Sequence, residues 1–243
     1  MSFDLEGQTA IVTGAARGIG LAIARRFAEL GARVSGWDLD FAPIAGDPAF
    51  VHSSNVDVTD EASVEVAFEA SRQALGDVKI IVANAGVNGP TKPVWDYTLD
   101  EWNHVLNVDL TGVFLSTRPV VRHMRETGYG RIVIMASVAG KEGNPGAGAY
   151  GSAKAGVIGF AKGLARELQP SNVTVNCIAP AITHTDLLDG MSEDYIAEKK
   201  GRIPMGRFCT AEEIADMSAW AASPRCSFTT GQVFDVTGGR ATY

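Results

Sequence analysis

A doubly wound parallel sheet of about seven strands, with helices on both faces, is the α/β fold that this 243-residue sequence predicts. Seven short runs of apolar and β-branched residues alternate with stretches whose apolar residues recur every three or four positions. Uninterrupted apolar strands suit a parallel sheet that is covered on both faces, and their alternation with helices indicates crossovers between parallel strands. A glycine-rich turn directly after the first run is a third indication.

The expected elements follow one another along nearly the whole chain. The run at residues 10–13 leads through the glycine-rich turn into a helix at 19–30, and the run at 33–37 is followed by another at 50–56. A helix at 61–75 precedes the run at 80–83, and a long helix at 100–125 precedes the run at 131–136. A helix at 150–168 leads to the run at 173–178, and a helix at 211–222 leads to the last run at 233–236.

Two connections depart from this alternation. Residues 39–49 contain Pro43, Gly46 and Pro48, which leave no room for a full helix, so we expect a loop or a single turn there. Residues 183–210 are polar and form a long excursion after a late strand. Such an excursion is typical of a lid over a binding site.

Composition limits the classes to which the protein can belong. A chain of 243 residues with 46% hydrophobic residues can bury one sizeable core, and we expect one domain over residues 1–243. The net charge of −7 argues against binding to nucleic acid or to an anionic membrane surface. The apolar runs are too short to span a bilayer, and residues 1–7 have no basic segment of a signal peptide. We expect a soluble, cytoplasmic protein.

The cysteines and histidines give no sign of a metal site or of a disulfide framework. The three cysteines are scattered along the chain without a CxxC pair. The four histidines are far apart, and none has ligand spacing to another. We therefore expect no bound metal.

The turn after the first run has the spacing of a phosphate-binding loop. Gly14, Gly18 and Gly20 allow a sharp turn, close approach to a pyrophosphate and tight packing of the following helix. Backbone amides at the start of that helix, around Arg17 and Ile19, would face the anion. A glycine-rich turn without a ligand is the alternative, and the strand before it and the helix after it favour the binding site.

Asp38 indicates which nucleotide binds there. It closes the second run, where a carboxylate accepts hydrogen bonds from the hydroxyls of the adenosine ribose. The same carboxylate would repel a 2′-phosphate, so the sequence predicts NAD. Arg17 is the one nearby cation placed to reach a 2′-phosphate, which keeps NADP as the second choice.

A serine, a tyrosine and a lysine form the second candidate site. Tyr150 and Lys154 are four residues apart at the start of a helix, so their side chains share a face. Ser137 lies at the end of the fifth run, where sites of parallel sheets are usually built. A phenol ordinarily has a pKa near 10, and a neighbouring ammonium favours the phenolate that can act as a base. A partly buried tyrosine beside an exposed lysine is the structural alternative.

These motifs together resemble the classical short-chain dehydrogenase/reductase (SDR) family over nearly the whole chain. Seven pieces occur in family order: Thr13-Gly14-x3-Gly18-x-Gly20, Asp57-Val58, Asn84-Ala85-Gly86, Asn107, Ser137, Tyr150-x3-Lys154 and Pro180-x4-Thr185. The resemblance implies a single Rossmann-type domain and an NAD(P)-dependent alcohol dehydrogenase or ketoreductase. It also implies that Asn107, Ser137, Tyr150 and Lys154 are the catalytic residues.

The resemblance implies further cofactor contacts. Asp57 and Val58 would line the adenine pocket, and the segment Asn84, Ala85 and Gly86 would support the sheet beside the adenosine. Tyr150 and Lys154 would also contact the nicotinamide ribose, and the backbone of Asn107 would hold a water that connects Lys154 to solvent. Pro180, Thr183 and Thr185 would lie beside the nicotinamide.

The substrate is expected to be a small hydroxylated molecule such as a sugar or sugar acid, which the enzyme would oxidise from secondary alcohol to ketone. Ser137, Tyr150, Asn144 and His184 are the candidate substrate contacts, and Arg240 in the tail could reach a neighbouring subunit's site. One alternative is an NADPH-dependent 3-oxoacyl thioester reductase, against which Asp38 and the acidic net charge stand. Another is an NAD-binding regulator without turnover, against which the complete catalytic set stands.

The resemblance also implies a homotetramer. Family helices that match residues 100–125 and 150–168 commonly pair across a two-fold axis. Val113, Phe114, Val157 and Phe160 are the apolar candidates for that contact. Packing against the sheet of their own subunit is the alternative role for these side chains.

Overall fold

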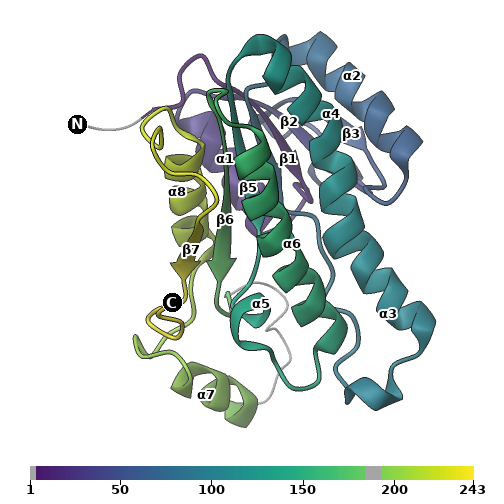
Figure 1. The fold of residues 1–243 in the computed structure, drawn as a ribbon, viewed down its shortest axis with the longest axis vertical. Coiled ribbons are helices and arrows are strands. Elements are labelled where there is room, and N and C mark those ends of the chain that lie inside the picture. The colour runs from purple at the N-terminus through teal and green to yellow at the C-terminus, as the bar shows by residue number, and fades with distance from the viewer. Residues whose placement is uncertain (1–3, 184–192) are drawn as a thin grey trace.

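The computed structural model describes residues 4–183 and 193–243. Seven parallel strands form one sheet in the order β3-β2-β1-β4-β5-β6-β7 (Figure 1). The strands are β1 (Thr9–Thr13), β2 (Arg33–Asp38), β3 (Phe50–Asn55), β4 (Ile80–Ala83), β5 (Gly130–Met135), β6 (Val173–Pro180) and β7 (Val233–Val236). The direction of winding reverses between β1 and β4, which confirms the doubly wound class.

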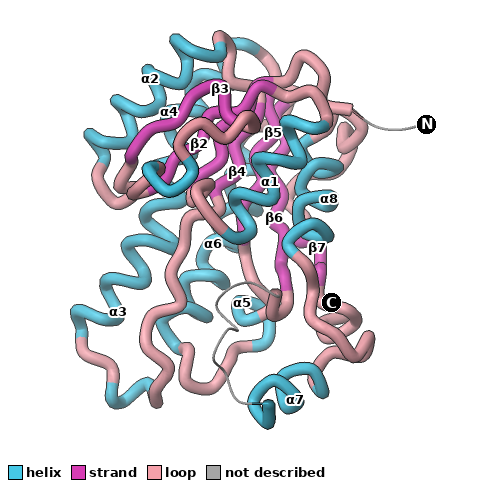
Figure 2. Tube along the Cα trace, turned by 180° about the vertical axis from the view of Figure 1, so that it is seen from behind, coloured by secondary structure: helices cyan, strands magenta, loops and turns pink. Residues whose placement is uncertain are grey.

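Helices cover both faces of this sheet. They are α1 (Gly18–Glu29), α2 (Glu61–Leu75), α3 (Leu99–Leu106), α4 (Gly112–Thr127), α5 (Ala139–Glu142), α6 (Gly148–Glu167), α7 (Glu193–Gly201) and α8 (Ala211–Ala222). Figure 1 shows α2, α4 and α6 in front of the sheet, and Figure 2, from behind, shows α1 and α8 on the other face.

The core consists of two apolar layers separated by the sheet. Ile11 packs with Val113 of α4 in the layer under α2, α4 and α6. Its neighbour Val12 packs with Ile23 of α1 and Ile214 of α8 in the opposite layer. Successive side chains of a strand point to opposite faces, so a strand that is buried on both faces must be apolar throughout. This is why the central strands read as uninterrupted apolar runs.

The structure refines the expected helix at 100–125. The path is helical throughout, but α3 and α4 are separated by a wider π-helical turn, Asn107–Thr111. Single π turns inside helices are frequent at functional sites. The expected helical stretch is therefore confirmed, but it is divided into two α-helices by a π turn that begins at Asn107.

Several short elements lie where the sequence indicated loops. The connection 39–49 contains a single 3-10 turn, Ala42–Ile44, as expected, and a second such turn is Val94–Asp96. Helix α5 has only four residues, too few to show an amphipathic period. Helix α7 lies within residues 183–210.

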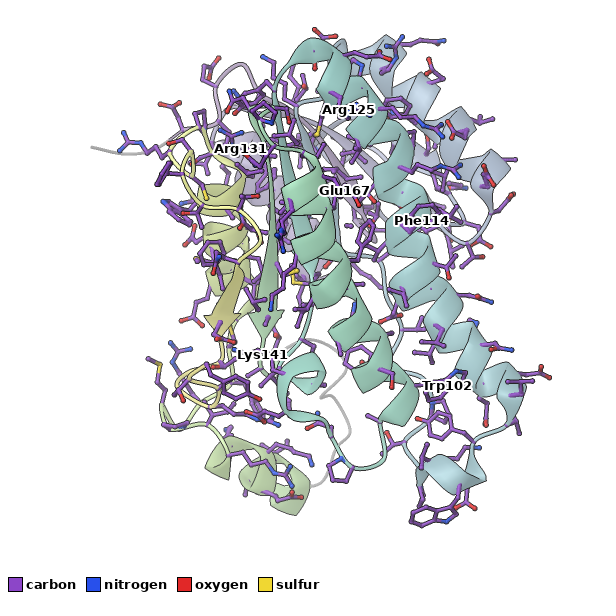
Figure 3. All side chains as sticks on the ribbon, in the orientation of Figure 1. Trp102, Phe114, Arg125, Arg131, Lys141 and Glu167 are labelled. Carbon is purple, nitrogen blue, oxygen red and sulfur yellow. The ribbon has the colours of Figure 1, made fainter. Side chains whose placement is uncertain are left out.

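The carboxyl ends of the strands and the short helices lie at the same end of the molecule. Figure 1 places α5, α7 and the C-terminus beyond the ends of β6 and β7. Figure 3 shows Lys141 of α5 at this end, whereas Arg131, near the start of β5, lies at the opposite end. Within the described residues, the loops predicted to hold cofactor or substrate therefore lie at the carboxyl end of the sheet.

Candidate active site

The glycine-rich turn has the geometry that the sequence predicted. Gly14 and Gly18 have φ of +63° and +54°, a region that favours glycine. At Gly20, a Cβ atom would lie 2.0 Å from the carbonyl oxygen of Gly14. Any other residue there would force the helix away from the loop. The glycines thus fix how closely α1 approaches the end of β1.

The N-terminus of α1 is built to receive an anion. Its N-cap residue Arg17 has extended backbone, and among the described residues no side chain caps the helix. The first turn, which holds Gly18, Ile19 and Gly20, contains no acidic residue. The amides of a first helical turn have no partner within the helix and carry partial positive charge. These residues fit the pyrophosphate of a dinucleotide.

Asp38 lies beside this loop. Its Oδ2 accepts a hydrogen bond from the amide of Ala16 at 2.9 Å, and its Oδ1 accepts one from the amide of Leu39 at 2.8 Å. The first bond joins the end of β2 to the loop after β1. The carboxylate is thus anchored where the adenosine half of a dinucleotide would lie.

The neighbouring cofactor candidates have structural contacts as well. The Asn84 side chain donates to the carbonyls of Thr13 at 3.0 Å and Gly14 at 3.2 Å. The amides of Asn84 and Ala85 both donate to the Thr13 hydroxyl at 2.9 Å. This segment therefore holds the end of β4 against the glycine-rich loop.

Asp57 and Val58 follow β3 at the same edge. Asp57 accepts from the amide and the hydroxyl of Thr59, while Val58 is buried beside α4. A Cβ atom on Gly112 of α4 would lie 2.9 Å from the Val58 side chain. The structure thus brings these two residues to the carboxyl end of the sheet, where the glycine-rich loop also lies, and packing fixes Val58.

Lys154 brings the start of α6, with Tyr150, to the end of β5, which Ser137 follows. The Lys154 ammonium lies 5.6 Å from the centre of the Tyr150 ring and donates to the carbonyl of Met135 at 3.0 Å. Met135 is the last residue of β5, and Ser137 follows two residues later with its hydroxyl accepting from the amide of Ala139 at 3.1 Å. Lys154 and Ser137 are buried, whereas Tyr150 is partly exposed.

Close packing of α5 on α6 holds this group together. A Cβ atom on Gly140 would lie 2.5 Å from the backbone of Lys154. The loop after β5 therefore rests directly on the helix that presents Tyr150 and Lys154.

A buried carboxylate that the sequence analysis did not select completes this group. Asp109 is fully buried, and its Oδ2 lies 3.2 Å from the Lys154 ammonium. Asn107, two residues earlier, begins the π turn and is exposed. The signal that could have found Asp109 is its position four residues from Val105 and Val113, on a helix face that is otherwise apolar.

The expected nicotinamide end is only partly described. Pro180 ends β6, and its carbonyl accepts from the amide of Val138 at 3.0 Å, which joins the loops after β5 and β6. Thr183 is buried, and its hydroxyl donates to the carbonyl of Ala181 at 3.3 Å. Thr185 and His184 lie outside the described residues.

Asn144 and the C-terminal tail contact each other. The Arg240 guanidinium donates to the Asn144 side chain at 3.0 Å and to the Glu142 carboxylate at 2.9 Å. The Lys141 ammonium pairs with Asp235 at 2.6 Å and bonds the carbonyl of Tyr243. In this structure Arg240 therefore holds a loop of its own chain, where the sequence had suggested a contact across subunits.

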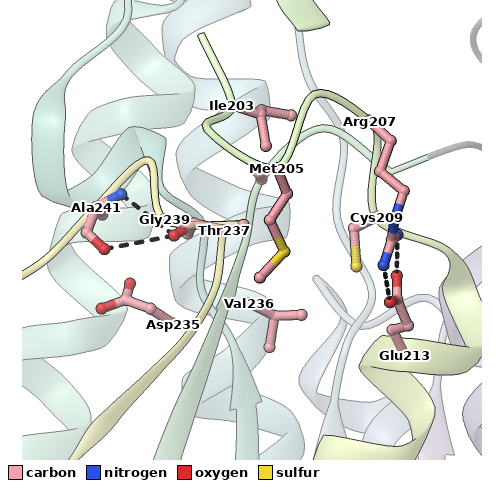
Figure 4. A pocket seen from close by; sticks show the side chains of 12 residues that line it. Ile203, Met205, Arg207, Cys209, Glu213, Asp235, Val236, Thr237, Gly239 and Ala241 are labelled. Atoms are coloured by element: carbon pink, nitrogen blue, oxygen red, sulfur yellow. Dashed lines mark hydrogen bonds and ion pairs between the residues drawn. The ribbon is translucent and has the colours of Figure 1, made fainter.

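A cavity of about 330 Å³ lies beside this tail (Figure 4). Residues after β6, before and within α8, and after β7 line it, and Arg207 and Glu213 pair at 2.6 Å at its rim. Burial raises the pKa of the Cys209 thiol in its wall to about 12. The thiol is therefore neutral at physiological pH. Among the described residues that line the cavity, neither Ser137 nor Tyr150 occurs.

The described residues contain neither a candidate metal site nor a candidate membrane span. Within residues 4–183 and 193–243, no three His, Cys, Asp or Glu side chains are arranged to hold a metal ion. No described helix is both long and apolar enough to cross a bilayer. The three cysteines are free and buried.

The doubly wound sheet, the uncapped helix at the glycine-rich loop and the serine, tyrosine and lysine group define a dinucleotide-dependent oxidoreductase. A family model described as "Enoyl-(Acyl carrier protein) reductase" matches residues 14–241. The chain belongs to the short-chain dehydrogenase/reductase family and is an enzyme of that class, which acts on alcohol and ketone groups.

Relatives match along nearly the whole chain. The 2-dehydro-3-deoxy-L-rhamnonate dehydrogenase (NAD(+)) of Sphingomonas sp. (strain SKA58) is 44% identical over 98% of this chain and 96% of its own. The 3-oxoacyl-(acyl-carrier-protein) reductase FabG of Escherichia coli (strain K12) is 38% identical over 97% of this chain and 98% of its own.

A solved structure confirms the fold. The 3-ketoacyl-(acyl-carrier-protein) reductase from Brucella melitensis, complexed with NADH, superposes with a TM-score of 0.92 and 33% identity. The superposition covers 98% of this chain and all of that one.

Proposed function

We propose that this enzyme oxidises a secondary alcohol of a small hydroxylated acid, such as a sugar acid, with NAD. The observation that carries the proposal is the placement of the buried Lys154 ammonium, 5.6 Å from the Tyr150 ring and bonded to Met135 just before Ser137. A cation, a phenol and a hydroxyl at the end of one strand suit proton transfer to and from an alcohol oxygen.

NAD is the cofactor that the residues favour. Asp38 is anchored to the glycine-rich loop by the Ala16 amide at 2.9 Å, so its carboxylate cannot easily turn away from a bound adenosine. A 2′-phosphate at this place would meet a fixed negative charge. The relative from Sphingomonas is named for NAD(+), and the Brucella structure contains NADH, which supports the same choice.

Each catalytic residue has a distinct role in this proposal. NAD, when bound, supplies the acceptor for the hydride. Ser137 holds the alcohol oxygen by a hydrogen bond, and Tyr150 accepts the hydroxyl proton. Lys154 stabilises the phenolate by its charge. Asn107, at the π turn, contributes its backbone carbonyl to the path by which the proton reaches solvent.

The sugar-acid substrate is supported by similarity along the whole chain. The 44% identical relative is named for 2-dehydro-3-deoxy-L-rhamnonate, a sugar acid, and has the same length within a few per cent. The FabG relatives are named for 3-oxoacyl groups on a carrier protein and make that reduction the second candidate. We also propose that Asn144, in the loop after β5, and His184 contact the substrate.

A substrate panel tests the proposal. The purified protein is incubated with NAD and with sugar acids, deoxy sugar acids, polyols and cyclic alcohols, and formation of NADH is followed. We expect turnover on a sugar acid, and at most weak oxidation of NADPH with a 3-oxoacyl thioester. Efficient reduction of the thioester, without oxidation of any sugar acid, would support the second candidate instead.

The remaining features of the proposal concern the whole protein. We propose one domain over residues 1–243 with a lid at 183–210, and a cytoplasmic location.

We also propose that the protein assembles into a homotetramer. In support of a helix-mediated assembly, Phe114 of α4 is 42% exposed and meets the partly buried Phe160 of α6 edge to face at 6.4 Å. Val113 and Val157 are buried in the core. This burial supports packing against the sheet of their own subunit, not a subunit contact, for these two side chains. Light scattering gives the number of subunits.

A further inference from the structure

Asp109 is a charged side chain in a place where packing alone would favour an apolar one. It lies inside the π turn Asn107–Thr111 and has no exposed surface. Its neighbours at four residues on either side, Val105 and Val113, are buried in the same way. Burial of an unpaired carboxylate is costly, so this side chain must be stabilised by specific partners.

Two separate segments supply those partners, and a glycine beside them leaves the room that they need. The amide of Val87, in the loop after β4, donates to Oδ1 of Asp109 at 2.7 Å. The Lys154 ammonium of α6 lies 3.2 Å from Oδ2. A Cβ atom on Gly86 would lie 3.1 Å from Oδ2 and 3.4 Å from the Lys154 ammonium. The family's Asn-Ala-Gly segment thus leaves just enough room for the ion pair.

Asp109 is the anion of the catalytic group. Within the described residues, Lys154 forms an ion pair only with Asp109, and its other polar contact, the Met135 carbonyl, is neutral. The titratable groups that face the pair are Tyr150 on α6, His104 on α3 and Cys177 on β6. His104 is exposed to solvent, and burial raises the pKa of Cys177 to about 12, so its thiol stays neutral.

We propose that Asp109 is a positioning residue, which fixes the Lys154 ammonium beside Tyr150 and sets the pH at which the Tyr150–Lys154 pair releases a proton. The proposal rests on the proposed function of that pair. A nearby negative charge opposes the loss of a proton, whichever of the two groups gives it up. Removal of this charge therefore moves the release to lower pH in either case.

The same contacts act on the pKa of the Asp109 carboxyl in opposite directions. Burial raises the pKa of the Asp109 carboxyl, and the Lys154 ammonium and the Val87 amide oppose that rise. The pair is stabilised as an ion pair only while both partners stay in contact. Without the carboxylate, the ammonium would be left buried with a single neutral acceptor, and its position beside Tyr150 would be less defined.

The substitution Asp109→Asn tests the proposal. It keeps the shape of the side chain and removes the charge, and Asp216→Asn on α8, where the aspartate pairs with Arg26 at the surface, is the matched control. We expect the acid limb of the pH profile of kcat/KM for alcohol oxidation to move down by roughly one pH unit. We also expect kcat to fall about tenfold because Lys154 is less well placed. The control keeps the wild-type profile.

A second measurement needs no substrate. The absorbance of tyrosinate is followed against pH, and the same curve for a variant that also carries Tyr150→Phe is subtracted to isolate Tyr150. We expect the midpoint of the Tyr150 transition to be lower in Asp109→Asn than in wild type. If the asparagine variant does not fold, Asp109→Ser, which is smaller and also neutral, takes its place.

The outcomes separate the two proposals. If the wild-type enzyme oxidises no alcohol, the proposed function fails, and the tyrosinate titration still decides the role of Asp109. An unchanged acid limb and an unchanged tyrosinate midpoint in a folded neutral variant would overturn that role and leave Asp109 a purely structural residue.

Discussion

Single charged side chains fix each of the two ends of this enzyme's site to the strands of the sheet. Asp38 joins β2 to the glycine-rich loop through the Ala16 amide, and Lys154 joins β5 to α6 through the Met135 carbonyl. Each is a charged group held by backbone that the sheet itself positions. The two ends of the site are therefore as rigid as the sheet.

The preference for NAD over NADP should depend on the Asp38 carboxylate. Asp38→Ser should raise kcat/KM with NADP relative to NAD by about tenfold or more, because a contact between like charges costs at least on the order of 1.4 kcal/mol. The ratio is measured with both cofactors on one substrate. Asp40→Ser, which removes a carboxylate that caps the turn at Ala42, is the control and should leave the ratio unchanged. Equal ratios in both variants would mean that Asp38 does not select the cofactor.

At the scale of elements, α8 begins with a capping box that also carries an ion pair. Thr210 and Glu213 bond each other's backbone amides, and Arg207 forms two bonds to the Glu213 carboxylate. The side-chain hydrogen bond from Arg207, followed by the backbone of Thr210, lowers the pKa of Glu213 to about 2. Because Glu213 also lines the cavity, the start of α8 fixes one of its walls.

Acid should weaken this box in a defined pH window. A carboxyl group whose pKa is lower in the folded state stabilises the fold above its ordinary value of 4.5 and loses that effect as the pH falls towards about 2. The melting temperature of Glu213→Gln should thus lie below that of wild type at pH 6, and the gap should close between pH 4.5 and 2. Glu212→Gln, in the same helical turn, is the control. A gap that is constant down to the lowest pH would contradict the expectation.

The contact between the C-terminal tail and the loop after β5 is the second feature at this scale. Arg240 is 8% exposed at its side chain and holds both Glu142 and Asn144, so the tail fixes the loop that carries a predicted substrate contact. Arg240→Met should raise KM for the substrate by about threefold to tenfold, as expected for the loss of a charge-assisted hydrogen bond. Steady-state kinetics measure this effect. Arg122→Met, which removes an exposed ion pair with Glu65, is the control and should leave KM and kcat unchanged. An unaltered KM in Arg240→Met would show that the contact of the tail with Glu142 and Asn144 does not hold the substrate loop.

At the scale of the whole molecule, the sheet could be predicted because its pattern is local. Runs such as β4, with all four residues apolar and buried, can be recognised from the sequence by their composition. The glycine-rich loop marks the point where β1 leads into α1. Asp109 and the Arg240 contact could not be found in this way. Both depend on residues that are distant in sequence: Lys154 lies 45 residues beyond Asp109, and Arg240 reaches back 98 residues to Glu142.

Contacts between distant residues also show what the family motifs add to a prediction from periodicity. Asn84 and Thr13 are 71 residues apart, yet they form two hydrogen bonds, and the Ala85 amide adds a third to the Thr13 hydroxyl. Periodicity cannot reveal such a contact, whereas the resemblance placed both residues in one site. The substrate loops carry no comparable motif, and their side chains had to be read from the structure.

Hydride transfer to NAD is tested most directly by following the hydrogen on the carbinol carbon. A sugar acid deuterated at that carbon is incubated with wild type and with Tyr150→Phe, with NAD in excess. We expect one equivalent of ketone and one of deuterated NADH with the wild-type enzyme, and no ketone with the variant although it still binds NADH. Ketone without deuterium in NADH, or full turnover in Tyr150→Phe, would contradict this expectation.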